Sequence, residues 1–304
     1  MKDGSDSKSG PTMNIQNIHS ESQLKNLPPK VRLISFGGGI KDVKKLIERF
    51  SRQAKSFHLI DEFQIFTEVD LRQDYLSEFQ EIIRNNPKGY GLWSWKPYLI
   101  KREMQQLNEG DILIYLDLGV EINKQGLSRF THYLDFLAKN DTLFFSLDHQ
   151  HRHYTKPDQR LLPIDKHYFR NQVVAGVLMF RITSETKDFV SEWFNMCKLN
   201  QGSLLVDTIP VSGNGEIYFK NHRHDQSLLS RLVFERGLTT IPDETIFRPW
   251  RLGKKYPFLA LRNTRGRFSW MWWVMRAPFV VWHIVYYITN PKLFRARFPK
   301  NEHS

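Results

Sequence analysis

The sequence holds a single cysteine, Cys197, and this scarcity excludes an intrachain disulfide and any cysteine-rich zinc site. Cys197 ends the segment Phe189–Cys197, where apolar residues recur at helical spacing, so we expect a buried structural thiol. The N-terminus also lacks the apolar core of a signal peptide. Residues 1–29 are instead polar and rich in Ser, Asn and Lys, which predicts a disordered leader. Together these absences favour a cytoplasmic, reducing location.

Acidic residues almost disappear after Glu244, where Glu302 is the only one against twelve lysines and arginines. The part of the chain up to Glu244 is nearly neutral, so the net charge of +12 comes from a C-terminal module, predicted to cover 246–304. Clustering of one sign of charge indicates an anionic partner, either a membrane surface or a nucleic acid.

Within this module, Phe268–Ile288 contains four of the eight tryptophans and no Asp or Glu. The segment is nearly long enough to span a bilayer, but insertion of Arg276 near its middle costs about 2.5–3.5 kcal/mol. Aromatic residues with basic flanks are typical of the membrane interface. The aromatic residues are continuous rather than interleaved with cations, which disfavours nucleic acid. We therefore expect peripheral attachment to the anionic, cytosolic face of a membrane, with a helix packed on the soluble domain as the alternative.

From about residue 30 to 245, predicted strands alternate with predicted helices, and no internal repeat is present. This alternation indicates an α/β domain with a mostly parallel sheet and helices on both faces. The expected strands are Val31–Phe36, part of Phe57–Val69, Ile112–Leu116, Thr142–Leu147 and Gln172–Arg181. One expected helix begins near Asp42, and another has Pro97 in its first turn. The other expected helices present Leu76–Ile83 and Leu127–Leu137 and cover Asp225–Arg236.

Asp117 follows the unbroken apolar run Ile112–Leu116, which is the pattern of a strand buried on both faces of a sheet. In open α/β sheets, ligands bind just beyond the carboxyl ends of the strands. A carboxylate placed there can hold a hard divalent cation, which can in turn bind a diphosphate. A simple cap of the following turn is the alternative role for Asp117.

Two other segments carry candidate ligand-binding residues. Gly37 begins a triple glycine after the first strand, where it either lets the backbone approach a nucleotide or forms a tight turn; its spacing matches neither a dinucleotide fingerprint nor a P-loop. In Gly89–Pro97, Trp93 and Trp95 are candidates to stack on a base or sugar. Lys96, at a helix start, is a candidate to contact a phosphate. Core packing is the alternative role for both tryptophans.

The polar segment Asn221–Ser227 immediately precedes a predicted helix. His224 and Asp225 are candidates to complete a metal or sugar site, and Gln226 to orient a hydroxyl, although a capping Asp beside exposed histidines explains the same residues. The histidine-rich run at 148–153 also follows a strand, and we expect a flexible polar loop over the site rather than a metal centre.

Four segments carry a resemblance to known proteins by their sequences and their order along the chain: Gly91–Pro97, Ile114–Gly119, Val174–Phe180 and His224–Leu229. Together they resemble nucleotide-sugar glycosyltransferases of the GT-A fold. The resemblance is greatest to bacterial capsule and lipopolysaccharide-type enzymes with a Gly-x-x-x-Trp-Lys-Pro segment, and more distant to the glycogenin and lipopolysaccharide galactosyltransferase group. The third matches a strand that lies beside the donor sugar in that group, and the fourth matches its Asp-Gln helix start.

This resemblance implies a divalent cation, Mn2+ or Mg2+, with Asp117 as a ligand. The family signature is usually Asp-x-Asp, but Gly119 takes the second position here. The missing ligand is then expected from Glu121, Asp225 or His224, with His224 as the named candidate; the alternative is an enzyme that depends less on a metal ion.

The resemblance also implies an activity, the transfer of a hexose from a nucleotide-diphosphate sugar, a UDP-sugar above all. The acceptor would be a glycan or a lipid-linked molecule in surface polysaccharide or glycolipid synthesis, and no nucleic acid partner is expected. The implied catalytic residues are Asp225 and Gln226, and the implied donor-binding residues are Gly37, Trp95, Lys96, Asp117, Ala175 and Gly176. The alternative is a catalytically degenerate relative that binds glycan or membrane.

Overall fold

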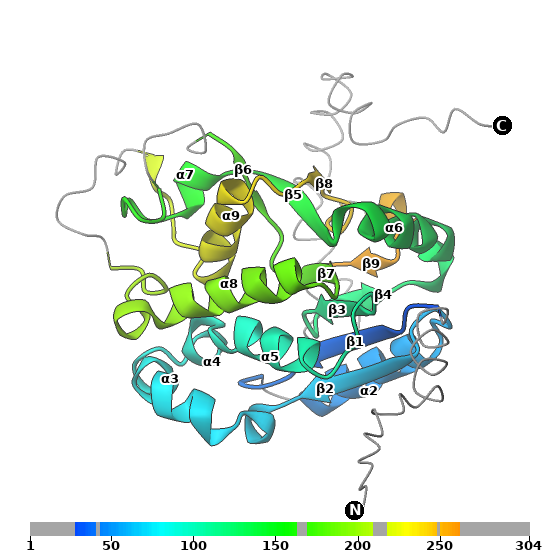
Figure 1. Cartoon of the computed structure of the whole chain (residues 1–304), viewed down its shortest axis with the longest axis horizontal. Helices are drawn as coiled ribbons and strands as arrows, with labels where there is room; N and C mark the ends of the chain where they lie inside the picture. The colour runs from blue at the N-terminus through cyan, green and yellow to red at the C-terminus, as the bar shows by residue number, and fades with distance from the viewer. Residues whose placement is uncertain (1–27, 41–42, 163–168, 209–217, 248–249, 262–304) are drawn as a thin grey trace, which may run out of the picture.

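The computed structural model describes residues 28–40, 43–162, 169–208, 218–247 and 250–261. These residues form a seven-stranded sheet with helices packed on both faces (Figure 1). The strand order is β2-β1-β3-β7-β5-β6, and β8 pairs with β5. The strands are β1 (Val31–Phe36), β2 (Glu62–Phe66), β3 (Ile112–Leu116), β5 (Thr142–Gln150), β6 (Asn171–Val173), β7 (Val177–Arg181) and β8 (Thr240–Pro242).

The sheet is mixed but mostly parallel. β1 is parallel to both β2 and β3, and β5 is parallel to β8. β7 is antiparallel to its neighbours β3 and β5, and β6 is antiparallel to β5. Five strands therefore point one way and two the other, which confirms the expected α/β fold with a mostly parallel sheet.

β3 separates two hydrophobic cores because successive side chains of a strand point to opposite faces. Leu113 and Tyr115 belong to the first core, and Ile112, Ile114 and Leu116 belong to the second. The first face is covered by α3 (Gln73–Asn85), α5 (Trp95–Met104), α8 (Ser184–Gly202) and α9 (Asp225–Glu235). The second face is covered by α2 (Val43–Lys55) and α6 (Leu127–Asn140).

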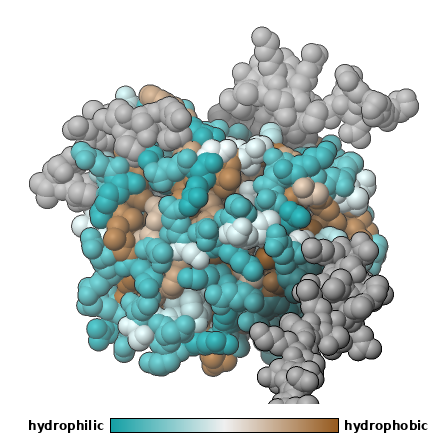
Figure 2. Space-filling model, viewed as in Figure 1, coloured by the Kyte–Doolittle hydropathy of each residue, from teal (hydrophilic) through white to brown (hydrophobic). Residues whose placement is uncertain are grey.

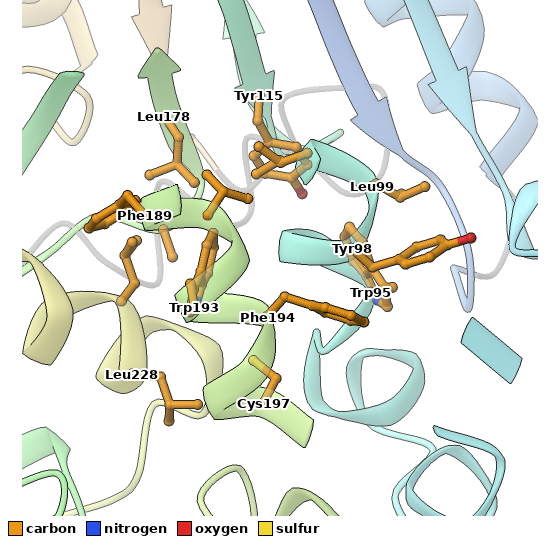
Figure 3. Close-up of a cluster of buried hydrophobic side chains, with 14 of the residues drawn as sticks. Trp95, Tyr98, Leu99, Tyr115, Leu178, Phe189, Trp193, Phe194, Cys197 and Leu228 are labelled. Atoms are coloured by element: carbon orange, nitrogen blue, oxygen red, sulfur yellow. The ribbon is translucent and has the colours of Figure 1, made fainter. Parts of the chain in front are cut away.

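Helix α8 lies between α5 and α9 on the first face (Figure 1). Its Trp193 is fully buried and donates from Nε1 to the backbone oxygen of Asp225 at 3.2 Å. Phe194 packs against Tyr98 of α5, with ring centroids 5.8 Å apart (Figure 3). Cys197 is buried in the same cluster, as predicted for a structural thiol, and burial raises its pKa. This packing fixes the starts of α5 and α9 relative to β3.

Several predicted elements have bounds at or near those predicted, but two segments differ in kind from the prediction. The expected strand Gln172–Arg181 is two antiparallel strands, β6 and β7, separated by Val174–Gly176. The histidine-rich run expected as a flexible loop continues β5 to Gln150 and then forms the short helix α7 (His151–Tyr154). The remaining short elements are α4 (Gly89–Leu92), η1 (Glu68–Asp70), η2 (Lys124–Gly126) and η4 (Trp250–Gly253).

The described part of the predicted C-terminal module packs on the α/β domain. β9 (Phe258–Leu259) pairs with β4 (Glu121–Ile122) in a two-stranded sheet. Asn123 donates from Nδ2 to the backbone oxygen of Tyr256 at 2.9 Å. Residues 1–27 and the aromatic segment Phe268–Ile288 lie outside the described residues, so the predictions about them remain predictions.

In the described ranges, no helix has the length and apolar character needed to cross a membrane. The face of the molecule in Figure 2 is largely hydrophilic, and its hydrophobic residues occur in separate groups.

Candidate active site

The candidate site lies where the strand order reverses, because the chain passes from β1 to β2 and then returns to β3 on the other side of β1. Such a switch point leaves a crevice at the carboxyl ends of the two strands. Gly37 follows β1 and Asp117 follows β3. A Cβ at Gly37 would lie 2.9 Å from Val43 and 3.3 Å from Leu118, so glycine lets the two segments approach.

Asp117 is the half-exposed group of the site, with a side chain 45% exposed. It lies two residues after Tyr115 and so extends toward the first face of the sheet, where α5 and α9 begin. The hydroxyl of Tyr115 donates to Asp117 Oδ1 at 2.6 Å. The backbone N–H of Asp117 donates to Gly176 O at 2.9 Å, and a Cβ at position 176 would lie 2.6 Å from Asp117 Oδ2. Glycine at 176 therefore leaves the space that this carboxylate occupies.

Lys96 comes from the first turn of α5, where Pro97 costs no hydrogen bond because the first N–H groups of a helix have no partner within it. Its side chain is only 3% exposed. Nζ donates to Ala175 O at 3.0 Å and lies 3.0 Å from Asp225 Oδ2 and 3.4 Å from Asp117 Oδ1. One buried ammonium group thus joins the end of β3, the β6–β7 connection and the start of α9.

Asp225 is the first residue of α9, where a carboxylate interacts favourably with the helix dipole. Its side chain is 6% exposed and makes no capping hydrogen bond, since His224 is the residue at the N-cap position. The contact with Lys96 is an ion pair without hydrogen-bond geometry, and Oδ2 accepts no hydrogen bond within the described part of the chain. This buried oxygen has acceptor capacity that suits a ligand hydroxyl.

The charges of the cluster depend on one another. Burial disfavours the charged form of Lys96, but Asp117 and Asp225 outweigh it and raise the pKa of Lys96. Burial raises the pKa of Asp225, against the opposing effect of Lys96. Burial and the charge of Asp117 raise the pKa of Tyr115, which therefore remains a hydrogen-bond donor. With both carboxylates ionised, the cluster carries one net negative charge.

The segment that leads into Lys96 is a left-handed turn. Every residue from Gly89 to Trp93 has a positive φ, between 51° and 80°. In this region a non-glycine residue costs about 1–2 kcal/mol, and Tyr90, Leu92 and Trp93 all bear that cost. Trp95 Nε1 holds the turn by donating to Gly89 O at 2.9 Å. Strain of this kind persists where the surrounding structure over-determines it, and it clusters at functional sites.

His224 is a second strained residue, with φ of 45°. Its Nδ1 donates to Leu205 O at 2.8 Å, and its Nε2 lies 3.1 Å from Lys88 Nζ. The ring is 3% exposed and stacks on Trp93 with centroids 5.6 Å apart. Both ring nitrogens have partners within the protein, and neither is directed at a cation beside Asp117. The metal-binding role of His224 remains a prediction.

The predicted Mn2+ or Mg2+ does not fit these side chains. Among the described residues, no group of three or more His, Cys, Asp or Glu side chains is arranged to hold a metal ion. The ammonium group of Lys96 stands between Asp117 and Asp225, where a bridging cation would lie. Glu121, the other candidate ligand, lies in β4, where its charge acts on Arg49.

Two of the predicted contacts take a different form in the structure. Trp95 is 4% exposed, with its ring centroid 3.9 Å from that of Phe36, which favours the core-packing alternative. Its predicted contact with a donor remains a prediction. Gln226 donates from Nε2 to Gln172 Oε1 at 2.9 Å, which ties α9 to β6. Its predicted role in orienting a hydroxyl remains a prediction.

Sequence reasoning missed Tyr115 and Gln172. The signal for Tyr115 was present, because a residue two positions before Asp117 in a strand points to the same face. Gln172 is fully buried and donates from Nε2 to Tyr154 O and Thr155 Oγ1, both at 3.0 Å. Its partners are distant in sequence, so no local pattern indicates its role.

No protein-family model and no curated protein matches the sequence. Among solved structures, the chain is similar to a glycosyltransferase involved in the glycosylation of the major capsid of PBCV-1, at 13% identity and a TM-score of 0.44, covering 78% of this chain and 97% of that chain. The galactosyltransferase LgtC, solved with donor and acceptor sugar analogues, gives 13% identity and a TM-score of 0.42, covering 73% and 77%. Mouse xyloside xylosyltransferase 1 in its apo form gives 11% identity and a TM-score of 0.38, covering 79% and 94%. Similarity to glycosyltransferases was expected from the sequence, but at TM-scores below 0.5 it does not bear on the reaction or the substrate.

Proposed function

We propose that this protein is a glycosyltransferase that moves a hexose from a nucleotide-diphosphate sugar to an acceptor hydroxyl. One observation carries the proposal: half-exposed Asp117, at the switch point of the sheet, is joined through buried Lys96 to buried Asp225. Removing charges from water is costly, and ionisable groups with perturbed pKa values in a crevice are typical of functional sites.

The charge of this cluster suits glycosyl transfer. The reaction breaks the bond between the anomeric carbon and the diphosphate and forms a bond to the acceptor oxygen, while positive charge develops on the sugar ring. One net negative charge, held in a fixed position by Lys96, stabilises that transition state. We place Asp225 near the anomeric carbon and favour retention of configuration.

Donor binding is assigned to the crevice between β1 and β3. Gly37 lets the segment after β1 pack closely against Val43 and Leu118, and the half-exposed carboxylate of Asp117 is available to accept hydrogen bonds from donor hydroxyls. Gly176 leaves the space for that carboxylate. Ala175 acts through its carbonyl oxygen, which Lys96 binds. A UDP-sugar is the proposed donor.

The proposed acceptor is a glycan or lipid-linked molecule in surface polysaccharide or glycolipid synthesis at the cytosolic face of a membrane. The support is in the sequence, where twelve basic residues follow Glu244 and the aromatic segment Phe268–Ile288 lies among them. A charged, aromatic segment of this kind is typical of attachment to an anionic membrane surface.

A thermal-shift screen of UDP-, GDP- and dTDP-sugars, each with and without Mn2+, tests the donor assignment. A ligand present at about 100 times its Kd stabilises a protein by about 2.7 kcal/mol, so the cognate donor is expected to raise the melting temperature clearly. The Mn2+ arm reveals any cation requirement directly. Absence of a shift with every nucleotide sugar would contradict the proposal.

A catalytically degenerate relative is the second candidate, and the observation that favours it is Gly119 at the usual position of a second aspartate. Such a module would bind glycan or membrane without turnover. Release of the nucleoside diphosphate from the donor that gives the thermal shift separates the two candidates, because only the enzyme produces it.

A further inference from the structure

Two segments that the proposed mechanism leaves unused contain several cations and histidines but no acidic residue: 149–156 and 218–224. The first begins with the last two residues of β5 and continues through α7, and the second precedes α9. Their lysines and arginines are Arg152, Lys156, Lys220 and Arg223.

The fold places these two segments side by side. The N–H of Lys220 donates to His153 O at 2.9 Å, and the N–H of Arg223 donates to Tyr154 O at 3.1 Å. The N–H of Lys156 donates to His222 Nδ1 at 3.2 Å. Segments of like charge are therefore held together by directed hydrogen bonds near α7 and the start of α9 (Figure 1).

Aromatic rings alternate with the cations on this surface. The guanidinium carbon of Arg152 lies 4.2 Å from the ring centroid of Tyr218 and 4.7 Å from that of Phe169. The guanidinium carbon of Arg223 lies 4.6 Å from the ring centroid of Tyr154, and Nζ of Lys220 lies 6.0 Å from it. Phe169 is 62% exposed and Tyr218 is 46% exposed. We name this set the basic-aromatic surface: Arg152, Tyr154, Phe169, Tyr218, Lys220 and Arg223.

The positive potential of this surface reaches the neighbouring imidazoles. Burial and the charge of Arg223 lower the pKa of His149, although Asp148 at the edge of the surface opposes this. Burial and the charges of Lys220 and Arg152 lower the pKa of His153. Positive charges close to an imidazole disfavour its protonated form, so both pKa shifts show that these cations lie near the two histidines.

Internal hydrogen bonds link the basic-aromatic surface to the candidate active site. Tyr154 O accepts hydrogen bonds from Ser227 Oγ at 2.8 Å and from Gln172 Nε2 at 3.0 Å. Ser227 follows Asp225 by two residues in α9, and Gln172 binds Gln226. Because Gln172 and Ser227 are fully buried, these hydrogen bonds hold the basic-aromatic surface in a fixed position relative to the turn of α9 that carries Asp225.

We propose that the basic-aromatic surface binds an acidic acceptor glycan, one whose sugars carry carboxylate or phosphate groups, and presents its hydroxyl to Asp225. This inference rests on the proposed glycosyltransferase function. Exposed aromatic rings offer flat apolar faces to the C–H faces of sugars. Guanidinium and ammonium groups pair with carboxylate and phosphate, arginine through two parallel hydrogen bonds. A neutral glycan would use only the first of these contacts.

The test uses the full-length chain and a hyaluronan octasaccharide, whose alternate sugars carry carboxylates, with maltoheptaose as the neutral probe. Binding is measured by calorimetry at about 0.15 M salt, where the Debye length is about 8 Å. This salt concentration limits long-range attraction of the anionic probe to the basic C-terminal module. The variant is Arg152→Gln with Lys220→Gln. The matched control, Lys44→Gln with Lys139→Gln, removes the same charge from exposed positions on α2 and α6, on the other face of the sheet.

We expect the octasaccharide to bind the wild-type chain more tightly than maltoheptaose, and the variant to lose at least about tenfold in affinity. The control should bind as the wild-type chain does. Equal affinities of variant and control would overturn the proposal, as would the absence of octasaccharide binding by the wild-type chain. The proposal would also be overturned if the variant lost affinity for single-stranded DNA, or for vesicles containing phosphatidylglycerol, but kept its affinity for the octasaccharide.

The thermal shift with the donor nucleotide sugar is measured on the same variant. It should be unchanged, because the donor crevice lies at β1 and β3. If the variant keeps both the donor-induced thermal shift and the octasaccharide affinity of the wild-type chain, the acidic acceptor alone is rejected. If the wild-type chain binds no nucleotide sugar, the proposed function itself is rejected.

Discussion

Asp117 has its two oxygens in different surroundings, since Oδ1 receives the Tyr115 hydroxyl and faces Lys96 while Oδ2 lies beside Gly176. Asp117→Asn keeps the shape and removes the charge. Turnover should fall at least about 100-fold, a loss of about 2.7 kcal/mol of transition-state stabilisation. Asp141→Asn is the control, because Asp141 is also a half-exposed carboxylate in an ion pair, with Arg181. Near-normal turnover of Asp117→Asn would remove Asp117 from the mechanism.

Lys96 is predicted to matter for folding as well as for catalysis. Lys96→Met leaves Asp225 buried without its ion-pair partner, and removal of one partner of a buried pair costs about 3–5 kcal/mol. Denaturant unfolding measures this loss. Lys101→Met on the same helix is the control, since Lys101 contacts only the ring of Phe194 in the described structure, with Nζ 5.5 Å from its centroid. A loss as small as that of the control would show that the cluster does not hold the fold together.

The pH dependence of turnover should report Asp225. The pKa of Asp225 is raised by burial, so turnover should decline on acidification at a pH above the ordinary aspartate value of about 3.9, as the carboxylate takes up a proton. Asp117 is a further group that raises this pKa. In the residual activity of Asp117→Asn, the acidic limb should therefore move to lower pH. If the acidic limb of the pH profile stays at the same pH or moves to higher pH, the protonation of Asp225 does not control turnover.

Sequence reasoning named Asp117, Lys96 and Asp225 individually, each from its place at the end of a strand or the start of a helix. It did not predict that they meet, because the contact of Lys96 with Asp225 joins helices far apart in the chain and depends on how α8 packs between them. Trp95 shows the same limit. Nothing local distinguishes a tryptophan that stacks on a ligand from one that packs on Phe36 in the core.

At the scale of elements, the left-handed turn offers the sharpest test. Gly91 has φ of 80°, and a Cβ there would lie 2.8 Å from Ile83. Gly237 has φ of 63°, but a Cβ there would meet nothing within 4 Å. Gly237→Ala should cost about 1–2 kcal/mol for the backbone alone, and Gly91→Ala should cost more because crowding is added.

Gly91→Ala should also lower turnover, since the turn sets the position of Lys96, while Gly237→Ala should not. Unfolding and turnover measured on the same preparations compare the two effects. Equal stability losses and equal activities in the two variants would mean that the turn contributes no more than any other left-handed glycine.

Most elements were predictable because burial leaves a periodic pattern in the sequence. β1 has the predicted bounds, Val31–Phe36, and α9 ends one residue before the predicted Arg236. The predicted single strand Gln172–Arg181 was wrong for a physical reason. The segment is apolar throughout, but at Val174–Gly176 the chain leaves the regular strand pairing, and Gly176 O accepts a hydrogen bond from the N–H of Asp117. Because Asp117 follows another strand, no local pattern in the sequence predicts this interruption.

At the scale of the whole molecule, most of the basic residues that follow Glu244 lie beyond Leu261, where the described structure ends. A chain that stops after Leu261 retains β9 and its pairing with β4. It should unfold at nearly the same temperature as the full-length protein and keep its donor-induced thermal shift. Unfolding of this truncated chain under native conditions would assign the last 43 residues to the core instead.

The full-length protein should sediment with anionic vesicles, and the truncated chain should not. Basic residues near such a surface contribute about 1 kcal/mol each, and salt screens this part, whereas burial of the aromatic segment is not screened. High salt should therefore release only part of the protein. Complete release would indicate purely electrostatic attachment.

The shared ammonium group of Lys96 has a consequence for how substitutions combine. Because Asp117, Lys96 and Asp225 set one another's charge, the free-energy changes from single replacements will overlap, and their sum will exceed that of the triple replacement. Substitutions at one of the three positions will also be tolerated only alongside particular residues at the other two. The cluster is thus a unit of epistasis, inherited or lost as a whole, although its members lie on three separate segments of the chain.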